Sequence, residues 1–94
     1  MKQLITNMQS PNGNPVPNQF ILTEGNKRTF QSYKTIIATI EGDNIILDKY
    51  YYDYSRTTTK YRNMFLGMDS KQVKDAILSG EIKLAQLNPE DHQA

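Results

Sequence analysis

The chain of 94 residues contains no cysteine and a single histidine, His92. Without cysteine there is no disulfide framework, no thiolate nucleophile and no Cys-based zinc site. Histidine is the side chain that most often transfers protons at neutral pH, and here it lies in a polar tail. These absences weigh against a zinc domain and against most enzyme classes, and they agree with a cytoplasmic protein.

Long apolar runs and glycine-rich loops are also missing. No run approaches the roughly 18 apolar residues needed to cross a bilayer, and the first residues lack the apolar region of a signal peptide. The five glycines stand singly and form no phosphate-binding or nucleophile-elbow motif. The carboxylates are scattered without a metal-ligand spacing. We therefore expect no cofactor, no bound metal and no membrane segment.

The composition predicts one folded domain of modest stability. Single cores usually contain about 100–150 residues, so this chain is too short for two. Eleven Lys and Arg against ten Asp and Glu give a net charge of +1. This balance argues against a polyanionic DNA mimic and against a strongly basic nucleic-acid packager.

Both ends of the chain are polar. Residues 8–18 contain three prolines and three asparagines, a composition that buries too little apolar area to offset the entropy of ordering. The sequence therefore predicts a flexible N-terminal arm over 1–18, a single α+β domain over 19–87 and a frayed tail over 88–94.

Alternating apolar residues between these ends predict a sheet. Expected strands cover 20–24, 27–33, 35–40, 45–54 and 58–66, and 82–87 is a closing extended segment. Gly25-Asn26 and the segment 41–44 supply the residues that favour hairpin turns. For 58–66 a helical turn is the alternative to a strand.

One short helix is predicted over about 69–79. Asp69 is suited to the N-cap, Gln72 completes a capping box, and Gly80 ends the helix. Its apolar stripe consists of Val73, Ala76 and Ile77. The predicted fold is thus an α+β domain, with an antiparallel sheet of about five or six strands and one helix packed on a face.

Residues 49–62, KYYYDYSRTTTKYR, form the most unusual segment. They hold five of the six tyrosines together with four cations and one Asp, a net charge of +3. Such a basic aromatic stretch is typical of a binding surface. The candidate binding residues are Tyr50, Tyr52, Tyr54, Arg56, Lys60, Tyr61 and Arg62.

Three interpretations of this segment compete. Tyrosine rings stack on bases while Lys and Arg contact phosphates, which suits single-stranded nucleic acid. Tyr and Arg are equally enriched at protein–protein hot spots. The rings can also simply pack across a sheet, because tyrosine and threonine favour strands. Three adjacent tyrosines at 50–52 point to both faces of a strand, so we expect some rings to be exposed.

Three motifs resemble short proteins of bacteriophages and mobile elements of Gram-positive bacteria. They are N-Q-F-I at 18–21, F-Q-S-Y at 30–33, and D-Y-S-x-T-T-x-x-Y-R-N-x-F-L-G at 53–67. The resemblance covers roughly residues 18–88. It implies a setting and no known activity: small phage proteins without catalytic residues commonly bind a host macromolecule, as anti-CRISPR and other anti-defence proteins do.

The sequence therefore predicts a non-enzymatic phage or mobile-element protein that binds and inhibits a host macromolecule, most simply a protein. The alternative is a single-stranded nucleic-acid-binding or transcription-associated accessory protein that uses the same residues. A nuclease that uses Tyr54 or Arg62 is a third hypothesis. An exposed strand edge also makes a homodimer plausible.

Overall fold

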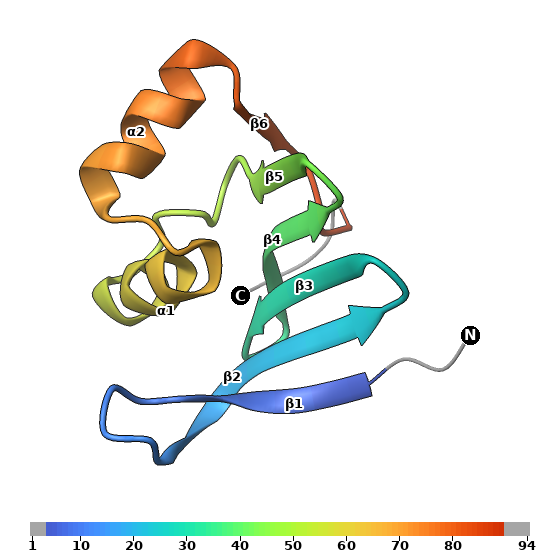
Figure 1. Ribbon diagram of the computed structural model, residues 1–94, viewed down its shortest axis with the longest axis vertical. Coiled ribbons are helices and arrows are strands. Elements are labelled where there is room, and N and C mark those ends of the chain that lie inside the picture. Colours follow the sequence, from blue (N-terminus) through green and yellow to red (C-terminus); the bar gives the residue numbers. More distant parts are fainter. Residues whose placement is uncertain (1–3, 90–94) are drawn as a thin grey trace.

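The computed structural model describes residues 4–89, which form one six-stranded sheet and two helices. The elements are β1 (Leu4–Gln9), β2 (Pro15–Glu24), β3 (Lys27–Ser32), β4 (Thr35–Glu41), β5 (Asn44–Asp48), α1 (Arg56–Leu66), α2 (Ser70–Ser79) and β6 (Ile82–Ala85). The strands lie in sequence order, and both helices lie on the same side of the sheet (Figure 1). The α+β class predicted from the sequence is confirmed.

The last strand makes the sheet mixed. The β2–β3 and β3–β4 pairs and the β4–β5 hairpin are antiparallel, as expected, with the first turn at Gly25-Asn26. β6 instead runs parallel to β5, with Ile45 opposite Ile82. Parallel neighbours need a long crossover, and here α1 and α2 together provide it. The predicted wholly antiparallel sheet with one helix is therefore corrected to a mixed sheet with two.

The expected N-terminal arm is largely a hairpin. Within the predicted arm over 1–18, residues 4–9 form β1 and pair with β2, and Met8 is buried in the core. The proline- and asparagine-rich stretch supplies the turn, where the Gly13 amide donates to the Ser10 carbonyl at 2.8 Å. The backbone hydrogen bonds between β1 and β2 offset the entropy lost on ordering this segment, which its own small apolar area does not offset. Residues 1–3 lie outside the described residues.

The segment 45–66 differs most from its sequence prediction. The long strand expected over 45–54 ends at Asp48 and is followed by turns, and the strand expected over 58–66 is α1. Residues 58, 61, 62 and 65 are buried, which is the spacing of one helical face. Burial of this face against the sheet overrides the low helix propensity of the threonines.

The predicted helix over 69–79 is confirmed as α2. Asp69 is its N-cap, the reciprocal bonds of a capping box with Gln72 are present, and Gly80 adopts the left-handed conformation at its end. Val73 and Ala76 are buried and Ile77 is half-buried, as the apolar stripe predicts.

The core lies between the sheet and the two helices. Phe30 on β3 and Phe65 on α1 meet with ring centroids 5.9 Å apart. Asn88, which the sequence places in a frayed tail, is instead buried: its side-chain amide donates to the Ile36 carbonyl and its oxygen accepts from the Ile36 amide. Residues 90–94 lie outside the described residues.

Candidate functional site

Hydrogen bonds to one buried carboxylate fix the backbone of the tyrosine-rich loop, residues 49–55. Asp48 is fully buried, and its Oδ2 accepts hydrogen bonds from the amides of Tyr50 and Tyr51 at 3.0 and 2.9 Å. Its Oδ1 accepts from the Leu87 amide and from the Asn88 side chain. Charge-assisted bonds of this kind are among the stronger ones in proteins. The loop is therefore a fixed element, although it contains no regular secondary structure.

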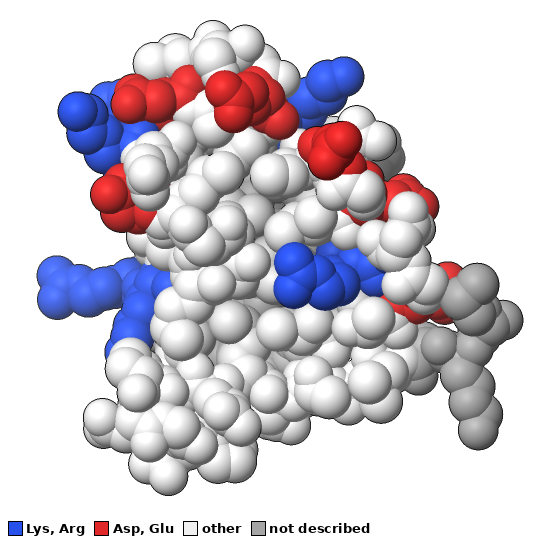
Figure 2. Space-filling view, in the orientation of Figure 1, with Lys and Arg blue, Asp and Glu red and all other residues white. Residues whose placement is uncertain are grey.

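Four of the seven predicted binding residues are on the surface. Tyr50 is 64% exposed and Tyr54 is 60% exposed. Arg56 and Lys60 are exposed one helical turn apart, on one face of α1. Figure 2 shows cations projecting on the side of the molecule where α1 lies. We call Tyr50, Tyr54, Arg56 and Lys60 the docking surface.

The other three predicted binding residues are buried or half-buried. Tyr61 is 6% exposed, the side chain of Arg62 is 3% exposed, and Tyr52 is half-buried. The Arg62 guanidinium lies 5.8 Å from the centroid of the Tyr52 ring. Arg62 and Tyr52 thus contact each other, and Tyr61 belongs to the hydrophobic core.

Arg62 is a buried cation whose guanidinium forms hydrogen bonds to neighbouring groups of the protein. Its Nη1 donates to the Tyr52 carbonyl at 2.7 Å, and its Nε and Nη2 both donate to Oδ1 of Asn63. Asp53 Oδ1 lies 3.6 Å from Nη1. Burial lowers the pKa of Arg62, and the charge of Asp53 opposes that shift. Arg62 ties loop 49–55 to α1.

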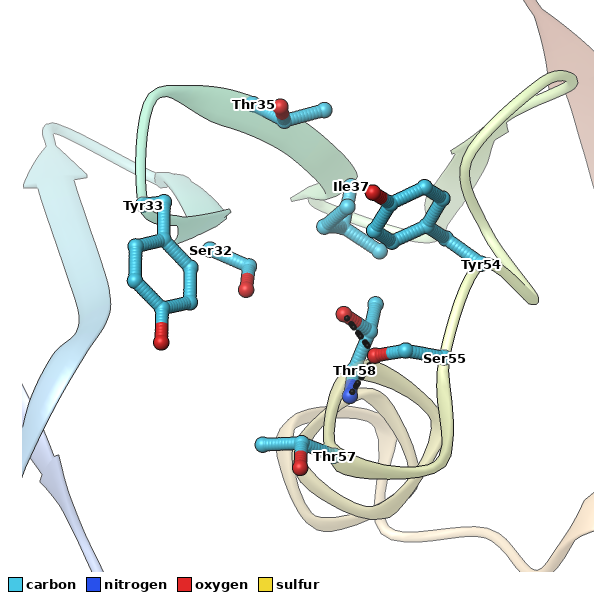
Figure 3. A pocket seen from close by; sticks show the side chains of 8 residues that line it. All are labelled: Ser32, Tyr33, Thr35, Ile37, Tyr54, Ser55, Thr57 and Thr58. Atoms are coloured by element: carbon cyan, nitrogen blue, oxygen red, sulfur yellow. Dashed lines mark hydrogen bonds between the residues drawn. The ribbon is translucent and has the colours of Figure 1, made fainter. Parts of the chain in front are cut away.

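A pocket of about 240 Å³ lies beside the start of α1. It is lined by Ser32, Tyr33, Thr35, Ile37, Tyr54, Ser55, Thr57 and Thr58. Tyr33 and Tyr54 stand on opposite sides of it (Figure 3). We call it the α1 pocket. Of its lining, the sequence reasoning singled out Tyr54 alone.

Tyr33 holds an unusual backbone conformation. It occupies the tight turn between β3 and β4 with φ 56°, in the left-handed region that a bulky residue rarely adopts. The turn is fixed by two bonds: the Tyr33 amide donates to the Asn18 carbonyl at 2.6 Å, and Gln31 Nε2 donates to the Tyr33 carbonyl at 2.8 Å. The ring is 62% exposed, so its packing does not compensate for the strain. Strain of this kind is concentrated at functional sites.

Replacing Tyr33 with asparagine is expected to stabilise the protein by about 0.5–1 kcal/mol, because asparagine adopts the left-handed region with less strain. Urea unfolding measures the change. Tyr50→Asn is the matched control, since Tyr50 is equally exposed and has no positive φ; its stability is expected to stay within about 0.5 kcal/mol. A destabilised Tyr33→Asn variant contradicts the interpretation of Tyr33 as strained.

A family model matches residues 4–80, from β1 to the end of α2. It describes a family of unknown function, DUF8033. The chain belongs to the DUF8033 family. The region that matches contains the docking surface and all residues of the α1 pocket. Comparisons of this DUF8033 chain with curated proteins and with solved structures find no match.

Two further structural findings concern the DUF8033 chain as a whole. Over residues 4–89, neither helix has the length and apolar character required to span a membrane. In the same range, no three His, Cys, Asp or Glu side chains gather in a way that suits a metal ion.

The DUF8033 sheet also has an exposed edge. β1 is one of its two outer strands, and Leu4 and Ile5 on β1 are 61% and 59% exposed. Residues 3–23 contain no charged side chain, and the lower part of the molecule in Figure 2 is correspondingly uncharged. Edges are usually protected by charge. The homodimer expected from the sequence stays a prediction, and β1 is the edge that favours it.

Proposed function

We propose that the protein is a non-enzymatic binding protein whose docking surface engages a partner macromolecule, most simply a protein. The observation that carries this proposal is that Tyr50 and Tyr54 are held exposed by a loop fixed on the buried Asp48 carboxylate. Exposed aromatic rings on a fixed backbone bind with little loss of conformational entropy, and tyrosine is among the residues enriched at protein–protein hot spots.

The two cations of the docking surface suggest the charge of the partner. Arg56 and Lys60 point from one face of α1, and within the described residues no carboxylate forms an ion pair with either. Charges at the rim of an interface mainly raise the association rate and select partners of opposite charge. We therefore propose an acidic surface on the partner, facing α1.

The resemblance to short phage and mobile-element proteins supplies the biological setting of the proposal. In that setting the partner belongs to the host, the protein acts in the host cytoplasm, and it inhibits by covering a surface that the partner needs. Inhibition of this kind requires no reaction at the docking surface, only occlusion of the partner.

The double substitution Tyr54→Ala with Arg56→Ala is expected to weaken binding about 100-fold, because hot-spot residues contribute about 2 kcal/mol or more when truncated. Both side chains are exposed, so the fold is expected to persist. The partner is first captured from a host lysate by the wild-type protein, and its affinity for each variant is then measured by calorimetry.

Leu78→Ala with Lys71→Ala is the matched control, because it removes one exposed apolar residue and one exposed cation from α2. This control is expected to bind as the wild type does. Equal affinity of wild type and the Tyr54/Arg56 variant contradicts the assignment of the docking surface, provided that circular dichroism shows both to be folded.

Single-stranded nucleic acid is the second candidate partner, because exposed rings beside Arg56 and Lys60 also suit bases and phosphates. Two arms of the experiment separate the candidates. Nuclease treatment of the lysate abolishes capture of nucleic acid and leaves capture of a protein unchanged. Log affinity falls by about 0.7 per neutralised phosphate for each unit of log salt on single strands, and much less for an aromatic protein interface.

A further inference from the structure

The positive end of the α1 helix dipole, at the first turn, is not neutralised by an acidic residue of that turn. Its N-cap Ser55 accepts from the Thr58 amide, and no acidic residue lies in the first turn. The amides of Arg56 and Thr57 donate to no group in the part of the chain that the structure describes. The helix dipole and these free amides together favour an anion.

The two helices differ at this position. The N-cap of α2 is Asp69, so α2 carries its own carboxylate at the site where α1 carries a neutral hydroxyl. The carboxylate nearest in sequence to α1 is already engaged, because Asp53 accepts from the Thr59 hydroxyl at 2.8 Å and lies near Arg62. The start of α1 therefore remains available to an anion from outside.

A second, independent observation lies across the pocket from the helix. Ser32 is 5% exposed, and its hydroxyl forms no hydrogen bond to another residue between 4 and 89. Figure 3 shows this side chain directed into the α1 pocket. Buried polar groups are nearly always hydrogen-bonded, so the Ser32 hydroxyl is available to donate to an acceptor that enters the pocket.

The shape and lining of the pocket indicate what the anion is attached to. The pocket has room for a short side chain, and it combines the apolar wall of Ile37 with hydroxyls and two tyrosine rings. A carboxylate at the end of a methylene chain fits this combination. A nucleic-acid phosphodiester fits less well, because it is linked to a sugar on both sides. In addition, no Lys or Arg is among the residues that line the pocket.

We propose that the α1 pocket binds the carboxylate of an acidic side chain from the partner protein. The amides of Arg56 and Thr57 and the hydroxyl of Ser32 donate to the carboxylate oxygens, and the rings of Tyr33 and Tyr54 flank the chain that carries it. This inference rests on the proposed function, since it names the group by which the partner engages the surface.

The direct test uses propionate, which reproduces the end of a glutamate side chain. The full ¹⁵N-labelled protein is titrated with sodium propionate, with sodium chloride at equal ionic strength as the reference. The amide signals of Arg56, Thr57 and Ser32 are expected to shift. The signals of Ser70 and Lys71, in the first turn of α2, are expected not to shift because Asp69 occupies that position.

Two variants make the test specific. Ser55→Asp keeps a good N-cap and places an internal carboxylate at the site, so it is expected to remain folded and to abolish the propionate shifts. Ser32→Ala removes one donor and is expected to weaken propionate binding about tenfold, the effect of one hydrogen bond to a charged group. The same spectra report directly whether each variant is folded.

The outcomes separate this inference from the proposed function. Shifts that are absent, equal in α1 and α2, or unchanged in Ser55→Asp overturn the carboxylate site. Tighter binding of inorganic phosphate or of an oligothymidylate than of propionate also overturns it, in favour of a phosphate site. A captured partner protein that binds Ser55→Asp and wild type equally overturns the carboxylate site and leaves the docking surface standing. If propionate binds but no protein is captured from the lysate, the carboxylate site is supported and the proposed function is overturned.

Discussion

Replacing Arg62 with alanine is expected to lower the free energy of unfolding by about 3 kcal/mol, a large part of the 5–15 kcal/mol typical of a small domain. The guanidinium donates to the Tyr52 carbonyl and to Asn63 Oδ1, and the variant leaves both acceptors without these bonds. Loss of the buried stem adds to the effect. Asp53 contributes little, because its side chain is 67% exposed and water solvates it.

Urea unfolding of Arg62→Ala, Arg62→Lys and Lys60→Ala tests this expectation. Lysine lacks the planar fork that reaches Asn63 with two N–H groups, so Arg62→Lys is expected to recover less than half of the loss. Lys60→Ala, which removes an exposed cation two residues away, is expected to change stability by less than about 0.5 kcal/mol. Equal stabilities of Arg62→Ala and Lys60→Ala contradict a structural role for Arg62.

Replacing Asp48 with alanine is expected to have the largest effect on the molecule, about 3–5 kcal/mol, because four donors lose a buried charged acceptor. Two of these donors are in loop 49–55 and two are in the segment after β6. Asp48→Asn retains the shape but faces the donors with its own N–H groups, so it is expected to lose at least half as much stability.

Thermal unfolding and amide hydrogen exchange measure the Asp48 effect. Protection is expected to fall first at Tyr50, Tyr51 and Leu87, the amides that donate to Asp48. Asp43→Asn is the control, because Asp43 lies exposed in the turn between β4 and β5. If Asp48→Asn melts at the wild-type temperature, the carboxylate does not hold the loop and the rigid docking surface loses its basis.

The hairpins β2–β3 and β4–β5 and the helix α2 were predictable because their signals are local. Gly25-Asn26 specifies a turn by backbone conformation alone, and Asp69 with Gln72 specifies a helix start within one turn. The residues that decide these elements are neighbours in sequence. The interactions that the rest of the fold adds agree with those local preferences.

The sequence favours a strand over 58–66 and gives helix only as the alternative, because the local and tertiary signals of α1 conflict. Three consecutive threonines at 57–59 favour a strand, and alternation of apolar residues in this segment supports the same interpretation. Ser55 was the available contrary signal, as an N-cap three residues before Thr58. The pairing of β1 with β2 was missed for a related reason. The composition of a segment indicates how much apolar area the segment itself can bury, but not which strand will pair with it.

The candidate site was predicted in part. Exposure of some rings followed from three adjacent tyrosines, and Tyr50 and Tyr54 are exposed. The burial of Arg62 could not be predicted, because the sequence shows a cation in a basic segment and not the acceptors that enclose it. The α1 pocket joins residues 32–37 with residues 54–58. Only the packing of α1 on β3 and β4 brings these segments together.

The position of Leu87 and Asn88 has a consequence for how the protein is made. Both donate to Asp48, which precedes them by 39 and 40 residues. During synthesis the ribosome releases loop 49–55 well before it releases these two partners, and contacts so distant in sequence form late. The nascent chain therefore carries its exposed tyrosines on an incomplete support until Leu87 and Asn88 have emerged.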